Sequence, residues 1–185
     1  NYDCMYCPSV YHDKDISTLY SLETLKEKWQ SFYSKTEHLN LPYKIDITGG
    51  EPTANKNFLP FIDWLRQNYQ LVKDIIVTSN GSASVNYYKK LSKYIDNLSL
   101  SFHGEFTDEA EFFSKSQELS VYFKSMRKYF HVNVMKESWN LERIELFRKY
   151  LDQHNINYSI NNLDESLGTR STVLQKGVIN IEQIL

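Results

Sequence analysis

The residues with the clearest chemical potential lie at the start of the chain, where Cys4 and Cys7 are three positions apart. Two thiolates at this spacing can ligate one metal centre from a single tight loop. Half of a zinc site, a redox dithiol and two incidental buried cysteines also fit this pair. A zinc site needs two further ligands, and the five histidines of the chain show no ligand spacing. A redox dithiol is expected near a helix start, whereas Pro8 and a polar run separate the cysteines from the first predicted helix.

A second group of chemically capable residues follows a predicted strand, in the run Thr-Gly-Gly-Glu-Pro-Thr at 48–53. Gly49 and Gly50 would let the backbone approach a ligand closely, because a side chain at either position would occupy the ligand's space. Glu51 could accept a hydrogen bond from an ammonium group or pin the loop. Without other evidence, the paired glycines also fit a plain turn at the end of a strand.

Helical and strand-like periods alternate along the rest of the chain. Helices are predicted at 21–38, 58–69, 85–95, 108–129 and 141–151, and strands at 43–48, 75–79, 98–103, 132–135 and 156–160. Such alternation predicts an α/β fold with a parallel sheet, either open or closed into a barrel. Leu98, Leu100 and Phe102 alternate with Ser99 and Ser101, and the two later strands alternate similarly. One face of the sheet should therefore pack on helices while the other faces a polar interior, which favours a partial barrel over a solvated sheet edge.

Taken together, these motifs resemble those of the radical S-adenosylmethionine (radical SAM) superfamily. Cys4, Tyr6 and Cys7 match the last half of its cluster loop, and Gly49-Gly50-Glu51 matches the motif that ends its second strand. The run 78–81 looks like its Thr-Asn-Gly motif, and 98–103 resembles the end of its fourth strand. By this resemblance, the position before Asn1 would be the first cluster cysteine. The first strand would likewise be missing from a partial (β/α)6 TIM-like barrel, with the core domain at 1–161 and an extension of it at 162–185.

The resemblance implies two cofactors, a [4Fe-4S] cluster and SAM. Cys4 and Cys7 would be metal ligands, and the implied SAM-binding residues are Tyr6, Gly49, Gly50, Glu51, Ser79, Asn80, Ser101 and Asn133. One electron would cleave SAM to methionine and a 5'-deoxyadenosyl radical, which would abstract hydrogen from a polar small molecule or peptide. His103 would be a catalytic candidate or a histidine satisfied by its neighbours. An electron donor such as flavodoxin or ferredoxin would be a partner.

Composition limits the other classes of function. The 185 residues are 41% hydrophobic and 24% charged, which predicts a folded globular domain. A formal net charge of -2 makes nucleic acid an unlikely partner. No apolar run is long enough to span a membrane, and no export signal opens the chain, so a cytoplasmic protein is expected. Two alternatives to a radical SAM enzyme stay open: a dithiol or metal-binding module without SAM chemistry, and a non-catalytic interaction domain.

Overall fold

The computed structural model of the chain describes residues 20–104, 106–136 and 141–162. The helices are α1 (Leu22–Thr36), α2 (Phe58–Asn68), α3 (Val85–Leu91), α4 (Glu109–Ser125) and α5 (Leu141–Gln153), with short 3-10 helices η1 (Glu37–Leu39) and η2 (Pro52–Ala54). The strands are β1 (Tyr43–Ile47), β2 (Val72–Ser79), β3 (Asn97–Phe102), β4 (Tyr129–Lys136) and β5 (Tyr158–Asn162).

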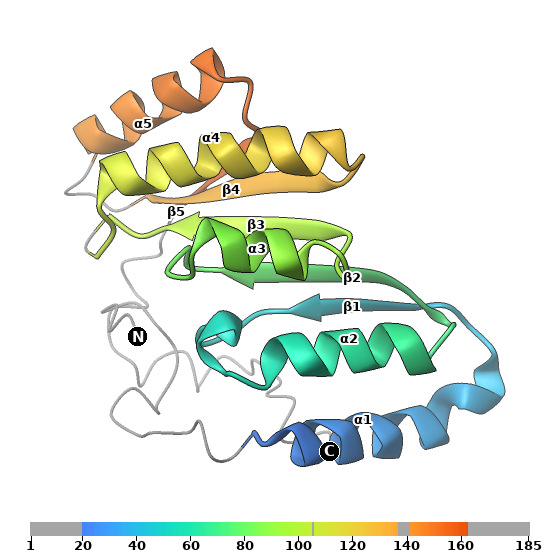
Figure 1. The fold of residues 1–185 in the computed structure, drawn as a ribbon. Coiled ribbons are helices and arrows are strands. Elements are labelled where there is room, and N and C mark those ends of the chain that lie inside the picture. Colours follow the sequence, from blue (N-terminus) through green and yellow to red (C-terminus); the bar gives the residue numbers. More distant parts are fainter. Residues whose placement is uncertain (1–19, 105, 137–140, 163–185) are drawn as a thin grey trace.

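The five strands form one parallel sheet in the sequential order β1-β2-β3-β4-β5. Right-handed crossovers between sequential parallel strands place their connecting helices on one face, as in a barrel. Figure 1 shows α2, α3 and α4 over the same face of this sheet. The sheet curls into a half-barrel, which confirms the predicted partial TIM-like α/β fold.

Element bounds differ from the sequence predictions at helix ends and at strand starts, and β2 and β4 each begin three positions earlier than predicted. The predicted helix 108–129 ends at Ser125, because Arg127 adopts a φ of 56° and the Lys128 amide bonds the Phe123 carbonyl at 2.9 Å. This left-handed residue and backward bond are a common helix C-cap. The predicted helix 85–95 ends at Leu91, and the last strand begins at Tyr158, two positions later than predicted. Helical periodicity continues past a C-cap in sequence, so it does not mark the end of a helix.

The hydrophobic core lies between the helices and one face of the sheet. Leu98, Leu100 and Phe102 of β3 are fully buried, and they pack in a cluster with apolar residues from α2 to α5. The alternate residues of β3 and β4 lie on the opposite face, where Ser99 pairs in register with His131 and Ser101 pairs with Asn133. The polar face predicted from the alternation of residue types is therefore present and continuous across these strands.

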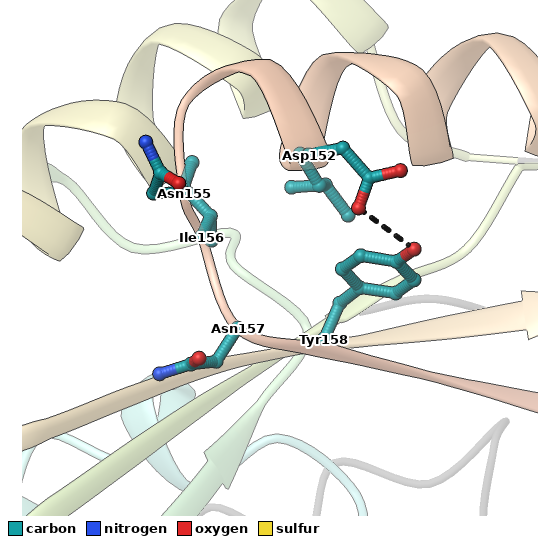
Figure 2. A pocket seen from close by; sticks show the side chains of 6 residues that line it. Asp152, Asn155, Ile156, Asn157 and Tyr158 are labelled. Atoms are coloured by element: carbon teal, nitrogen blue, oxygen red, sulfur yellow. Dashed lines mark hydrogen bonds between the residues drawn. The ribbon is translucent and has the colours of Figure 1, made fainter.

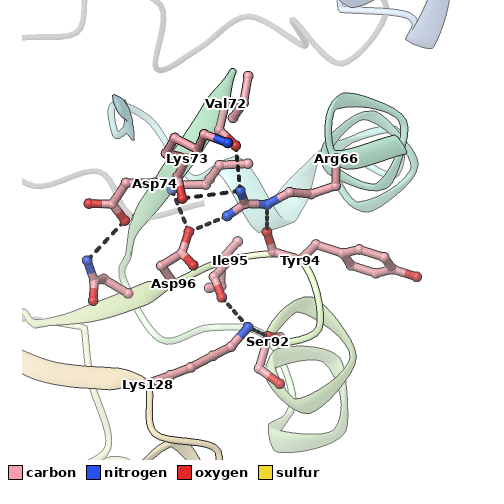
Figure 3. Close-up of polar contacts among 11 residues, drawn as sticks. Arg66, Val72, Lys73, Asp74, Ser92, Tyr94, Ile95, Asp96 and Lys128 are labelled. Carbon is pink, nitrogen blue, oxygen red and sulfur yellow. Dashed lines mark hydrogen bonds and ion pairs between the residues drawn. The ribbon is translucent and has the colours of Figure 1, made fainter. Parts of the chain in front are cut away.

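An ionic cluster holds the amino ends of the strands together. The Arg66 guanidinium donates to the carbonyls of Tyr94 and Val72 at 2.5 and 2.9 Å, and it pairs with the Asp96 carboxylate (Figure 3). Asp96 also accepts from the Ile75 amide at 2.8 Å. Charged groups thus satisfy backbone atoms at the edge of the sheet opposite the Gly49-Gly50 loop.

Aromatic contacts attach α1 to the edge of the sheet. Trp29 lies with its ring centroid 5.8 Å from that of Tyr43 and 5.6 Å from that of Tyr69. No residue of α1 is fully buried, so the helix depends on these ring contacts for its position. In the described ranges, no helix has the length and apolar character needed to cross a bilayer.

Candidate active site

The loop after β1 leaves open space beside both of its glycines. Gly49 and Gly50 have φ values of 90° and 51°, a region that side chains disfavour. A Cβ atom built on either residue would have no heavy atom within 4 Å. The loop is therefore shaped so that a ligand could approach its backbone, which fits the role that the radical SAM resemblance gives to these two positions.

Glu51 joins this glycine loop to the end of β2. Its Oε1 accepts from the Thr53 amide at 3.0 Å and from the Thr53 hydroxyl at 2.5 Å. The same oxygen accepts from Ser79 Oγ at 2.8 Å, and Oε2 accepts from the Asn80 amide at 2.6 Å. Of the two roles considered for Glu51, the structure shows it pinning the loop, because its carboxylate receives four hydrogen bonds from protein groups.

Ser79 lies on the helix-facing side of β2. Its hydroxyl has one hydrogen, which it donates to Glu51, so the 2.7 Å contact with Tyr88 is donated by the tyrosine. Burial raises the pKa of the Tyr88 phenol and keeps it protonated. Burial, with the Glu51 charge as the smaller cause, raises the pKa of Tyr87 to about 12. The Ser79 hydroxyl thus helps to fix the position of the Glu51 carboxylate from the helix-facing side of β2.

Asn80 and Gly81 form the turn that leaves β2. Asn80 is 8% exposed, and its Oδ1 accepts from the Ser82 amide at 3.0 Å. Gly81 has a φ of 78°, and a Cβ there would lie 2.9 Å from the Phe112 ring. The turn is therefore held by packing as well as by its bond to Glu51, and its form depends on glycine at position 81.

Ser101 lies in the middle of the polar face and is only 5% exposed. Among the residues that the structure describes, none makes a hydrogen bond to its hydroxyl. This hydroxyl could therefore hydrogen-bond water or a ligand on that face. This placement fits the inward orientation predicted from the alternation in β3.

Asn133, beside Ser101, ends a chain of hydrogen bonds that sequence reasoning did not assign. Ser159 Oγ donates to Asn133 Oδ1 at 3.1 Å, so the 3.0 Å contact between Ser159 and His131 is donated by Nε2 of the histidine. His131 Nδ1 then accepts from the Tyr129 hydroxyl at 3.2 Å, and burial lowers the His131 pKa. The chain orients the Asn133 amide with its N–H groups available. Strand alternation places His131 and Ser159 on this face, but their pairing depends on the β4–β5 register.

His103 follows β3 at the same edge of the sheet as Gly49, Gly50 and Asn80. Burial lowers its pKa to about 4, so the imidazole is neutral near pH 7. A neutral histidine can exchange a proton or serve a structural role. Its position at the carboxyl edge matches the prediction, and its proposed catalytic role stays a prediction.

The start of α1 is also held at this edge. Asn55 and Asn57 donate from their side-chain amides to the Tyr20 carbonyl at 3.1 and 3.2 Å. Both asparagines follow η2, which itself begins directly after Glu51. Cys4, Tyr6 and Cys7 lie outside the described residues. Within the described part of the chain, no three His, Cys, Asp or Glu side chains gather as a metal site.

One cavity among the described residues lies away from this edge, where α5 turns into β5. It measures about 360 Å³ and is lined by residues from Leu151 to Tyr158. Tyr158 donates to Asp152 Oδ1 at 3.0 Å beside it (Figure 2). Parallel α/β barrels carry their ligands at the carboxyl ends of strands. This cavity adjoins the amino end of β5, so we place the candidate site at the opposite edge.

The described residues thus form a curled parallel sheet with a glycine loop and an acidic anchor at one edge, which is the architecture of a partial-barrel α/β protein. The chain is 34% identical over 83 residues to GTP 3',8-cyclase from Pasteurella multocida strain Pm70, and 32% identical over 82 residues to that of Photorhabdus laumondii subsp. laumondii. These partial matches support the resemblance of the chain to the radical SAM superfamily. Each match covers 44% of this chain and 23% of the cyclase.

A solved structure, Streptococcus suis SuiB bound to S-adenosylmethionine, is similar with a TM-score of 0.46 and 22% identity. The similarity covers 65% of this chain and 30% of SuiB. No protein-family model matches the chain.

Proposed function

We propose that this chain is the core of a radical SAM enzyme that abstracts hydrogen from a polar small molecule or peptide. The observation that carries the proposal is the Glu51 anchor. It fixes the Gly49-Gly50 loop to the Asn80 turn, so two motifs to which the resemblance gives a SAM-binding role are held at one edge of a curled sheet. The partial matches to radical SAM cyclases support the same class of enzyme.

Each residue at the edge has a distinct part in this proposal. The backbone at Gly49 and Gly50 would receive the methionine end of SAM in the space that these residues leave open. Asn80, Ser101 and the Asn133 amide would hydrogen-bond the rest of SAM, while Tyr6 would support its adenine. Glu51 and Ser79 act by fixing the geometry of the loop and the turn.

Cys4 and Cys7 would ligate a [4Fe-4S] cluster together with a third cysteine. With SAM bound, the cluster supplies the one-electron cleavage that yields methionine and a radical able to take a hydrogen atom. An external donor such as flavodoxin or ferredoxin would supply that electron. The polar face of β3, β4 and β5 would hold and orient the substrate through hydroxyl and amide groups.

The test is anaerobic reconstitution of the full-length protein with iron and sulfide, followed by reduction with SAM present. The expected product is 5'-deoxyadenosine, together with bound iron that is lost in Cys4→Ala and Cys7→Ala variants. Iron binding without 5'-deoxyadenosine would favour a metal-binding module. Absence of both, with the residue encoded before Asn1 not a cysteine, would favour an interaction domain.

A matched pair of variants tests the anchor itself. Glu51→Gln places an amide donor among four protein donors, so we expect SAM affinity to fall at least tenfold, with stability reduced by about 1–3 kcal/mol. Glu118→Gln alters an exposed carboxylate on α4 and should leave SAM affinity unchanged. Equal SAM affinity in the two variants would contradict the role given to Glu51.

A further inference from the structure

Lys115 is an unusual residue for the buried side of a helix. It lies on α4 between the buried residues Phe112 and Leu119, and it is only 7% exposed. Lysine is almost never this buried unless its ammonium group is paired, because transfer of the charge from water is costly. Its burial therefore calls for an explanation in terms of what the ammonium group contacts.

The ammonium group reaches the turn that leaves β2. Lys115 Nζ donates to the Gly81 carbonyl at 2.5 Å and lies 3.3 Å from Glu111 Oε1. The Glu111 side chain is 73% exposed, so this ion pair is largely screened by water. Gly81 itself is buried, and its carbonyl needs a donor from the protein. The bond to Gly81 is thus the contact that accounts for the buried lysine.

The same helix holds Gly81 by packing. The Phe112 ring occupies the space where a side chain at position 81 would project. On the other side of the turn, Glu51 accepts from the Asn80 amide at 2.6 Å. The Asn80-Gly81 turn is therefore held from one side by the glycine loop and from the other by α4.

We propose that Lys115 is a positioning residue of the candidate active site. It fixes the Gly81 carbonyl and, through it, the Asn80 turn that would contact SAM. This inference rests on the proposed function for its effect on SAM, whereas its effect on the turn can be measured without any cofactor. Through Lys115, the position of α4 would influence the geometry of the sheet edge where SAM is proposed to bind.

The test compares Lys115→Met with Lys124→Met in the full-length protein. Methionine keeps an unbranched apolar stem but loses the donor, and Lys124 is exposed on the same helix. Hydrogen exchange of a peptide covering 79–84 should accelerate about tenfold in Lys115→Met and stay unchanged in Lys124→Met. A peptide from β4 serves as the internal reference. On reconstituted protein, the Kd for SAM should rise at least fivefold in Lys115→Met only.

Two results would overturn the inference. If exchange at 79–84 is unchanged while the melting temperature falls, Lys115 is a packing residue only. If exchange accelerates but the Kd for SAM is unchanged, the turn does not govern cofactor binding. If the unmodified protein fails to bind SAM, the proposed function fails, and the exchange result still decides whether Lys115 holds the turn. Should Lys115→Met not fold, the same measurements on Lys115→Gln, which is too short to reach Gly81, replace it.

Discussion

The polar side chains at the carboxyl edge fall into two groups. Some form hydrogen bonds with other protein groups, and others are available to a ligand. The Glu51 carboxylate accepts hydrogen bonds from the Ser79 hydroxyl and from the Thr53 and Asn80 amides, so both side chains are bonded to protein groups. Ser101 and the N–H groups of Asn133 have no such partner in the described part of the chain. A ligand at this edge would therefore meet Ser101 and Asn133, while Glu51 and Ser79 determine where the neighbouring backbone lies.

His103 gives a prediction at the residue scale. Burial lowers its pKa from the ordinary 6.5 to about 4, so the unfolded chain binds the proton more readily than the folded one. The stability due to neutral His103 is complete above pH 6.5 and is lost progressively as the pH falls toward 4. The loss should reach about 3 kcal/mol, at 1.36 kcal/mol for each unit of pKa difference.

Urea unfolding between pH 4 and 7 measures this effect. A His103→Gln variant should lose the share of the pH dependence that His103 contributes and keep the share due to His131, whose pKa burial also lowers. His154→Gln, at an exposed position near the end of α5, should keep the full dependence. If both variants keep the full slope, the buried His103 is not the group that titrates.

At the scale of elements, α1 connects the aromatic edge of the sheet to the candidate site. Its beginning is tied by Asn55 and Asn57 to the segment after Glu51, and its body rests on the Trp29 ring contacts. None of the residues of α1 is fully buried, so the position of the helix depends on contacts of a few aromatic side chains. Cys4 and Cys7 precede this end of α1 in the sequence.

Replacing Trp29 by alanine should loosen α1. We expect a stability loss of about 2–4 kcal/mol, because a large ring in contact with Phe32, Tyr33, Tyr43 and Tyr69 is removed. Limited proteolysis should then cleave first within 22–39. Leu146→Ala, at a side chain 66% exposed on α5, should cost less than about 0.5 kcal/mol and leave the cleavage pattern unchanged. Equal losses in the two variants would show that α1 does not depend on Trp29.

Across the whole molecule, the two edges of the sheet carry different kinds of polar group. The amino edge is held by Arg66, Asp96 and Lys128, which satisfy backbone carbonyls and amides (Figure 3). Burial lowers the pKa of Lys128 there. The carboxyl edge carries glycines, hydroxyls and amides, together with the Glu51 carboxylate and the Lys115 ammonium group. This division matches the barrel rule that stability and chemistry lie at opposite ends of the strands.

The division can be tested with one variant at the amino edge. Asp96→Asn removes the charge that pairs with Arg66 and should lower stability by about 1–3 kcal/mol. Its Kd for SAM should stay within twofold of the unmodified protein, in contrast to Glu51→Gln. Thermal unfolding and equilibrium dialysis with SAM give the two values. A Kd changed as much as in Glu51→Gln would show that the edges are coupled.

Much of this arrangement could be predicted from the sequence. Alternation in 98–103 predicted the buried and polar faces of β3, and the paired glycines at 49–50 predicted where the chain turns after β1. Such features repeat with the short period of a strand or depend on one residue's backbone freedom. They can therefore be predicted from residues that are adjacent in the sequence.

Contacts between distant segments were decided only by the tertiary structure. Glu51 and Asn80 are 29 positions apart, Lys115 and Gly81 are 34 apart, and Ser159 and Asn133 are 26 apart. Each pairing depends on strand register or on the rotation of a helix about its axis, and neither is fixed by local periodicity. The chain's own residues thus determined which groups stand at the edge, whereas packing determined which of them are turned toward the protein and which are left for a ligand.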